Sequence, residues 1–348
     1  MQRLRHFVPP QLRRAARALL RRLTPTKGIR RQPGDPTSFG TVVDERWTWL
    51  PQHLPPDVAR YQGDIYTKDD QRRLGERLGL QMAETYLAGV PLAEVLAYVE
   101  EHALERFVVK PISSYNAIGC RALVATERGF LDLRSEQQLS LEGHGFAMAR
   151  AYAPLGRRDA WVLEELLLPV DGTLRAVDDY KFYCLGGRVE LVLQTRPQRR
   201  GKRFKQFHDR KWQPVKVGLE DRKTFVYEVP VNGRKLVQFA EAVASRLAYP
   251  FMRIDAYDTT RGIVLGEFTP GPGRTHEFND EWNDYLLRRW YEAEAALLEG
   301  MRSGTITPLG PPSADAASTC VSRPAWRQEE RSAKGDPDGG KTPGSNVV

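Results

Sequence analysis

The sequence predicts an α+β protein, because paired-strand patterns and amphipathic helical patterns alternate along the 348-residue chain. Two apolar strands flank a turn at residues 258–262, and another strand pair flanks a Gly-Gly turn at 186–187. Apolar residues recur at helical spacing in 92–103, 234–247 and 282–301. Hydrophobic residues make up 41% of the chain and aromatic residues 9%, as in ordinary globular proteins. A chain of this length can bury one large core or two medium ones.

The formal net charge of +8 is concentrated at the N-terminus, where a run of Arg and Lys residues precedes the first acidic residue, Asp35. Within this leader, residues 11–23 place leucines on one helical face and arginines on the other. Such a helix can lie on an anionic membrane surface, and it can equally be a solvated basic extension. Residues 1–31 are therefore a candidate for peripheral membrane contact.

No apolar run approaches the ~20 residues that a membrane span needs, and no apolar segment follows the basic N-terminus as in a secretory signal. The cysteines Cys120, Cys184 and Cys320 are scattered and odd in number, which argues against a disulfide framework. These features predict a cytoplasmic protein, with a peripheral position at the inner face of the cell membrane as a further option.

Residues 35–104 combine a linker with a helical region. The part rich in Pro and Gly predicts a linker that leads into a Trp-containing loop at 46–49. From Thr67 the pattern turns helical, with apolar residues four positions apart: Leu74, Leu78, Met82 and Tyr86. Beyond residue 303 the composition shifts to Pro, Gly, Ser, Asp and Lys, which predicts a disordered tail.

Two carboxylates stand at corresponding ends of the strands that flank the turn at 258–262. The first strand ends on Asp255 and the second on Glu267, so pairing of the strands as a hairpin brings the two side chains together. Carboxylates this close repel each other unless a cation lies between them. Hard oxygen ligands of this kind suit Mg²⁺, whose other positions go to water and substrate phosphates. The alternative is that both acids are solvated strand ends.

A lysine at a strand end introduces a second informative stretch. The buried-type strand 107–109 delivers Lys110, and a loop of small polar residues follows before the chain returns as a strand. A lysine beside a loop of amide donors can neutralise and cradle phosphate oxygens. The loop positions that can contribute are Ser113, Ser114, Asn116 and Gly119.

Two further strands carry charged residues whose role the pattern alone leaves open. Trp161–Leu163 reads as a strand that Glu164-Glu165 interrupts, which is also typical of a strand end at the surface. The hairpin around 186–187 carries Lys181, which as an isolated feature is an exposed strand lysine. Basic residues with interleaved aromatics follow over 196–223. That stretch predicts a basic rim that attracts an acidic acceptor or a triphosphate, or else a solvated charged loop.

These sequence motifs resemble those of the ATP-grasp superfamily, and within it those of the TupA-like proteins, which are named for teichuronopeptide synthesis. Arg253-Ile254-Asp255 and Glu267-Phe268-Thr269-Pro270-Gly271 are similar to the metal-binding end of D-alanine ligases, with Thr269 where that family usually has Asn. The motif Asp-Tyr-Lys-Phe-Tyr-Cys at residues 179–184 is nearly identical to the corresponding motif of TupA-like proteins. Thr67-Lys68 and Arg72 resemble the start of a TupA-like helix, where Lys68 is either a nucleotide contact or a solvated lysine.

The resemblance implies an ATP-grasp fold, in which two α+β subdomains clamp ATP, and it implies a role for each motif. Mg²⁺ would be held by Asp255, Glu267 and, more weakly, Thr269. Lys181 and Arg253 would be catalytic. The nucleotide would be bound by Lys110, the loop residues named above and the hinge residues Glu164, Glu165, Leu167 and Asp171. The implied parts are a leader (1–34), a linker and helical region (35–104), a small subdomain (105–172), a large subdomain (173–305) and the tail (306–348).

The usual chemistry of this superfamily is ligation of a carboxylate to an amine through an acyl phosphate. The resemblance to TupA-like proteins implies a small-molecule or polymeric acidic acceptor, such as a cell-envelope polysaccharide or its precursor. A peptide or natural-product ligase and a glycan kinase on the same fold are alternatives. From another class, the chain could be a non-catalytic module whose basic segments bind membrane or nucleic acid. Retention of the charged site residues argues against that class, and we expect no specific nucleic acid partner.

Overall fold

The computed structural model describes residues 38–49, 68–112, 118–156, 158–197, 203–218, 228–247, 249–273 and 278–305. All of these residues belong to one compact unit of the chain. The predicted leader and tail lie outside the described residues. Among the helices that the structure describes, none is long and apolar enough to cross a membrane.

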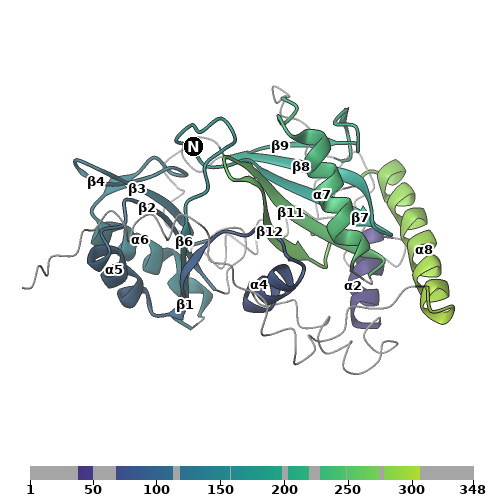
Figure 1. Ribbon diagram of the computed structural model, residues 1–348, viewed down its shortest axis with the longest axis horizontal. Coiled ribbons are helices and arrows are strands. Elements are labelled where there is room, and N and C mark those ends of the chain that lie inside the picture. The colour runs from purple at the N-terminus through teal and green to yellow at the C-terminus, as the bar shows by residue number, and fades with distance from the viewer. Residues whose placement is uncertain are drawn as a thin grey trace, which may run out of the picture. The chain divides into compact units, whose positions relative to one another are not determined.

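The first sheet has six antiparallel strands in the order β1-β6-β2-β3-β4-β5, and helices α5 and α6 pack against it (Figure 1). Alternation along β6 separates a core face from a second face, because Trp161 and Leu163 are buried with the helices. Glu164 and Lys110 of β2 lie on the second face. The elements are β1 (Thr85–Val90), α5 (Leu92–Glu101), β2 (Arg106–Pro111), β3 (Arg121–Thr126), β4 (Gly129–Asp132), β5 (Gln138–Leu139), α6 (Leu141–Tyr152) and β6 (Trp161–Glu165).

The second sheet also has six antiparallel strands, in the order β10-β9-β8-β7-β11-β12. Helix α7 packs along one face over Phe182 and Ile254, while α8 packs on the other face over Tyr183 and Phe251, together with α2 (Figure 1). The elements are α2 (Phe39–Trp49), β7 (Asp179–Leu185), β8 (Arg188–Pro197), β9 (Arg203–His208), β10 (Pro214–Val215), α7 (Gly233–Ser245), β11 (Phe251–Thr259), β12 (Gly262–Thr269) and α8 (Asp280–Arg302).

The segment between α4 (Lys68–Arg77) and β1 joins the edges of both sheets. Met82 forms a parallel bridge with Leu265 of β12, and the Leu265 amide donates to the Gln81 carbonyl at 2.8 Å. Two residues further on, the Glu84 carbonyl accepts from the amide of Glu165 in β6 at 2.9 Å. Backbone hydrogen bonds of one short segment therefore fix the edge of each sheet.

Two expectations about the N-terminal region were wrong. Residues 46–49 are the last part of helix α2 and not a loop, since Phe39 and Val43 earlier in the helix bury their side chains in the second core. The helix expected through Tyr86 ends at Arg77, because Gly79 adopts a φ of 65°. Tyr86 belongs to strand β1, and its spacing from Leu78 is a coincidence of two different elements.

Candidate nucleotide and metal site

Three neighbouring strands bring three charged side chains into one row on the α8 face of the second sheet. Asp255 of β11 lies opposite Lys181 of β7 on one side and opposite Glu267 of β12 on the other. All three point to the same face, because residues directly opposite in a sheet share a face. The structure thus brings together two of the predicted metal ligands, Asp255 and Glu267, and the predicted catalytic residue Lys181.

The carboxylate of Asp255 is the centre of this row. It is 3% exposed, and it accepts hydrogen bonds from Lys181 Nζ at 2.5 Å and from Arg253 Nε and NH2 at 2.7 and 2.8 Å. Lys181 Nζ also lies 2.7 Å from Asp179 Oδ2. Two cations therefore share one buried carboxylate, and a second carboxylate, which the motifs did not single out, holds the lysine from its other side.

Glu267 and Thr269 form the outer part of the site. The Thr269 hydroxyl donates to Glu267 Oε1 at 2.7 Å and accepts from Arg253 NH2 at 2.9 Å, while Arg253 NH2 also lies 3.6 Å from Glu267. The Glu267 side chain is 38% exposed, in contrast to the buried Asp255. Thr269 thus links the arginine to the glutamate, and Glu267 is more accessible than Asp255.

Burial opposes ionisation in this cluster, and the neighbouring charges decide the direction of each shift. Burial raises the pKa of Asp255, but Lys181 and Arg253 together outweigh it, so that this pKa lies below its usual range. Burial lowers the pKa of Lys181, but Asp179 and Asp255 outweigh it and raise this pKa overall. The pKa of Asp179 is raised, because burial and the charge of Asp255 exceed the effect of Lys181. Asp255 is therefore ionised and Lys181 protonated at neutral pH.

A narrow pocket of about 100 Å³ lies between the second face of the first sheet and the edge strand β12. Lys110 and Glu164 line it and form an ion pair at 2.5 Å. Burial lowers the pKa of Lys110, but the charge and hydrogen bond of Glu164 outweigh it and raise the pKa. The other lining residues are Gln71, Arg72, Met82, Ala83, Thr85, Ala88, Ile112, Val162, Leu167, Tyr257, Leu265 and Gly266. Ligand pockets usually measure about 300–1,000 Å³, so a nucleotide would require the walls to move apart.

A bulge in β12 shapes the floor of the pocket, which the sequence pattern did not predict. Asp255 pairs with Glu267 but Ala256 pairs with Leu265, so Gly266 is the extra residue of the bulge. A Cβ atom on Gly266 would lie 2.8 Å from the Tyr257 ring. The glycine therefore lets the Tyr257 side chain approach β12 closely. Arg253, Asp255 and Tyr257 occupy every second position of one strand. This spacing could have predicted that Tyr257 lies on the same face as the two charged residues.

The hinge residues fall into two groups. Glu164 and Leu167 line the pocket, whereas the Glu165 side chain is on the opposite face of β6 and forms an ion pair with Arg261 in the β11–β12 turn. The backbone after the hinge pairs with the same turn, since the Thr260 amide donates to the Leu168 carbonyl at 3.2 Å. Glu165 therefore connects the first sheet to the second one outside the pocket.

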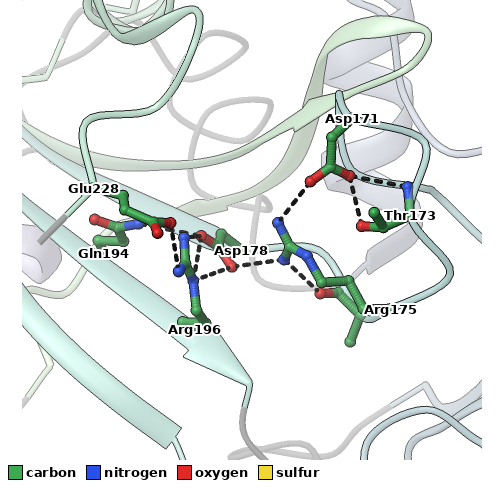
Figure 2. A network of polar contacts seen from close by, with 8 residues as sticks. Asp171, Thr173, Arg175, Asp178, Gln194, Arg196 and Glu228 are labelled. Atoms are coloured by element: carbon green, nitrogen blue, oxygen red, sulfur yellow. Dashed lines mark hydrogen bonds and ion pairs between the residues drawn. The ribbon is translucent and has the colours of Figure 1, made fainter. Parts of the chain in front are cut away.

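Asp171 does not line the pocket, and its carboxylate belongs to a separate polar network (Figure 2). It accepts from the Thr173 hydroxyl at 2.6 Å and lies 3.7 Å from Arg175 NH2. Arg175 and Arg196 both donate to Asp178, the residue before Asp179, at 3.1 and 2.8 Å. The network therefore fixes the start of β7, on the face opposite to Lys181.

The predicted basic rim over 196–223 is only partly described, and two of its arginines, Arg196 and Arg210, form ion pairs. Arg196 NH1 donates to Glu228 at 2.7 Å in addition to binding Asp178. Arg210 binds both oxygens of Glu241 at 2.7 Å. Of the predicted phosphate loop, Gly119 adopts a φ of 75° next to Pro111 and Trp161, whereas Ser113, Ser114 and Asn116 lie outside the described residues, as does the leader 1–31.

The donor set fits Mg²⁺ when phosphate oxygens complete it. Across the described part of the chain, no group of three or more His, Cys, Asp and Glu side chains could hold a metal ion. Mg²⁺ in nucleotide sites needs only one or two carboxylates beside water and phosphates. Glu267 and Asp255 can supply them, although Asp255 must then release a hydrogen bond from Lys181 or Arg253.

Comparison with known proteins gives one family match and several distant structural likenesses. The family model described as TupA-like ATPgrasp matches residues 90–289, more than half of the chain. The chain is similar to the D-alanine–D-alanine ligase of Bacillus anthracis, with a TM-score of 0.44 and 12% identity over 76% of this chain and 78% of that one. No curated protein matches the chain.

Two more solved structures are similar over less than two thirds of their own length. The D-alanine–D-alanine ligase of Helicobacter pylori has a TM-score of 0.38 and 11% identity over 66% of this chain and 59% of that one. The ATP-grasp ligase PsnB, complexed with minimal precursor, has a TM-score of 0.34 and 15% identity over 66% and 62%.

The contrast between Asp255 and Glu267 predicts unequal effects on stability. Asp255→Asn leaves two cations without their shared buried partner and should lower the free energy of unfolding by about 3–5 kcal/mol. Glu267→Gln removes a more exposed charge and should cost less than about 1 kcal/mol. Urea denaturation of both variants and the wild type at pH 7 measures the difference. Equal losses would show that the carboxylate of Asp255 is not the buried centre of the cluster.

A buried histidine in β9 predicts a stability change between pH 7 and pH 5. His208 is fully buried, its Nε2 lies 3.1 Å from Gln194 Oε1, and burial lowers its pKa from 6.5 to about 4. Between these values the unfolded chain binds a proton that the native state does not, so stability falls as pH falls. From pH 7 to pH 5 the loss due to His208 should be about 2 kcal/mol.

Urea denaturation at both pH values tests this contribution. His208→Gln should remove about 2 kcal/mol of the decrease. An identical decrease in wild type and His208→Gln would contradict the assignment of a neutral buried imidazole.

Proposed function

Because the chain belongs to the TupA-like ATP-grasp family, we propose that it is an ATP- and Mg²⁺-dependent carboxylate–amine ligase that acts through an acyl phosphate. The observation that supports this most strongly is the row of Lys181, Asp255 and Glu267 beside a pocket that contains Lys110. Such a row offers both signs of charge: carboxylates for a metal ion and ammonium groups for phosphate. Among the similar proteins, the Bacillus anthracis ligase has been solved complexed with ATP, and PsnB has been solved complexed with Mg and ADP.

The residues divide the work between binding and phosphoryl transfer. Lys110 and Glu164 would bind the nucleotide in the pocket, with the apolar side chain of Leu265 against the base. Asp255 and Glu267 would hold Mg²⁺, which offsets phosphate charge when bound. Lys181 can leave Asp255 for a phosphoryl oxygen while Asp179 keeps it in place. The γ-phosphoryl group would move to a substrate carboxylate oxygen and release ADP.

Arg253 is suited to the second step, in which an amine attacks the acyl carbon and phosphate leaves. Its Nε and NH2 are fixed by Asp255 and Thr269, which orients the guanidinium group. NH1 points to the Gly271–Gly273 loop, since a Cβ on Gly273 would lie 3.6 Å from it, and it has no hydrogen bond to any described residue. A fixed donor at this position would stabilise the oxyanion of the tetrahedral intermediate.

Membership of the TupA-like family is what supports the proposed class of substrate. We propose an acidic acceptor, such as a cell-envelope polysaccharide or its precursor, whose carboxylate is joined to an amino acid. A glycan kinase on the same fold would leave the phosphoryl group on its product, whereas a ligase releases inorganic phosphate. Assay of phosphate release with uronates and amino acids separates the two outcomes.

Calorimetry of ATP binding tests the nucleotide and metal site. The wild type should bind ATP with Mg²⁺ in the micromolar range, about −8 kcal/mol. Glu267→Gln should weaken binding by about tenfold or more in the presence of Mg²⁺, since a metal ligand is lost. The same substitution should have little effect on the affinity for ATP when Mg²⁺ is replaced by EDTA.

Glu94→Gln, at an exposed position of α5, is the matched control and should bind as the wild type does. Absence of nucleotide binding to the wild type would overturn the ligase proposal and favour a non-catalytic module. A Glu267→Gln variant that keeps full Mg²⁺-dependent affinity would remove Glu267 from the metal site.

A further inference from the structure

Helix α4 lies outside the segment 90–289 that matches the family model, yet it forms a wall of the candidate nucleotide pocket. Gln71 and Arg72 of this helix line the pocket together with Lys110 and Glu164 from the first sheet. The pocket therefore has three walls: the first sheet, the edge of the second sheet, and α4. The third wall has no role in the ligase chemistry described above.

Packing holds α4 firmly against the second sheet. Leu74 and Leu78 are buried in the same core as α7. Gly75 allows a close approach, because a Cβ there would lie 2.3 Å from Met82 Sδ. One turn of α4 thus packs directly against the segment that bridges to Leu265. The position of Arg72 relative to the pocket is consequently set by the core and not by a mobile loop.

A hydrogen bond places this turn of α4 close to the predicted metal ligand. Gln71 Oε1 accepts from the backbone amide of Phe268 at 3.3 Å, and Phe268 follows Glu267 directly in β12. Arg72 is the next residue along the helix. Arg72 therefore lines the pocket from the α4 wall, and its neighbour Gln71 contacts β12 directly after Glu267.

The charges of the pocket favour an anionic ligand. Lys110 is neutralised by Glu164 at 2.5 Å within the pocket. Arg72 contributes a second positive charge, and its ion-pair partner Glu76, at 2.5 Å, is on the helix and does not line the pocket. This pair is of the (i, i+4) type and half exposed, so the pair itself contributes little to stability. A guanidinium group can form two parallel hydrogen bonds to phosphate oxygens.

We propose that Arg72 is a nucleotide-binding residue whose guanidinium group binds a phosphate of ATP from helix α4. The inference rests on the proposed nucleotide site and extends it to a part of the chain that the family match does not include. Arg72 makes the pocket selective for the charged part of the nucleotide.

Calorimetry with ATP, ADP and adenosine tests the proposal on the full-length protein. Arg72→Gln should weaken ATP and ADP binding by about tenfold, as expected for the loss of one charge-assisted contact, and leave adenosine binding unchanged. Arg72→Lys should restore part of the affinity for ATP. Arg73→Gln, at the neighbouring exposed position of the same helix, is the matched control and should bind all three ligands as the wild type does.

Two outcomes would overturn the proposal. If Arg72→Gln binds ATP as Arg73→Gln does, Arg72 makes no contact with the nucleotide. If Arg72→Gln weakens adenosine as much as ATP, the contact is not with phosphate. Both outcomes differ from a failure of the proposed function, in which the wild type itself would not bind ATP with Mg²⁺. Equal melting temperatures of the variants would verify that they fold alike.

Discussion

The site depends on one electrostatic constraint: the buried carboxylate of Asp255 must be balanced by positive charge. Lys181 and Arg253 supply that balance, and each lies on a strand position that the sheet register fixes. A buried ion pair contributes little net stability, but loss of one partner is costly. The arrangement therefore specifies geometry more than it stabilises the fold. It holds Lys181 and Arg253 in fixed positions, which are the positions that the proposed phosphoryl and acyl transfer requires.

Both faces of the second sheet carry an apolar core, and the charged row lies on the α8 face, further along the strands than Tyr183 and Phe251. The α7 face is filled with apolar side chains and stabilises the sheet by burial. At the start of β7, Asp178 is held by arginines on the α7 face, while Asp179 binds Lys181 on the other face. The adjacent residues Asp178 and Asp179 thus connect the polar network of Figure 2 with the site. The bulge at Gly266 then adjusts β12, so that Glu267 stays opposite Asp255.

Strand and helix patterns predicted the α+β class and the hairpin that pairs Asp255 with Glu267. The family resemblance implied that Lys110 and Glu164 belong to one nucleotide site, and both residues line one pocket. These features depend on local strand alternation and on motifs that are close in sequence. The sequence did not predict that Glu165 faces away from the pocket, because one residue of register decides the face. Nor did it predict the ion pair of Arg261 with Glu165, because such a contact between distant segments leaves no periodic signal.

The most direct test of the proposed site is a crystal structure of the protein with a non-hydrolysable ATP analogue and Mg²⁺. The base should lie beside Glu164 and Leu167, the phosphates at Lys110, and a metal ion about 2.0–2.1 Å from an oxygen of Glu267. Lys181 should still bind Asp179. A nucleotide bound elsewhere, or a metal ion without a contact to Glu267 or Asp255, would contradict the proposed site.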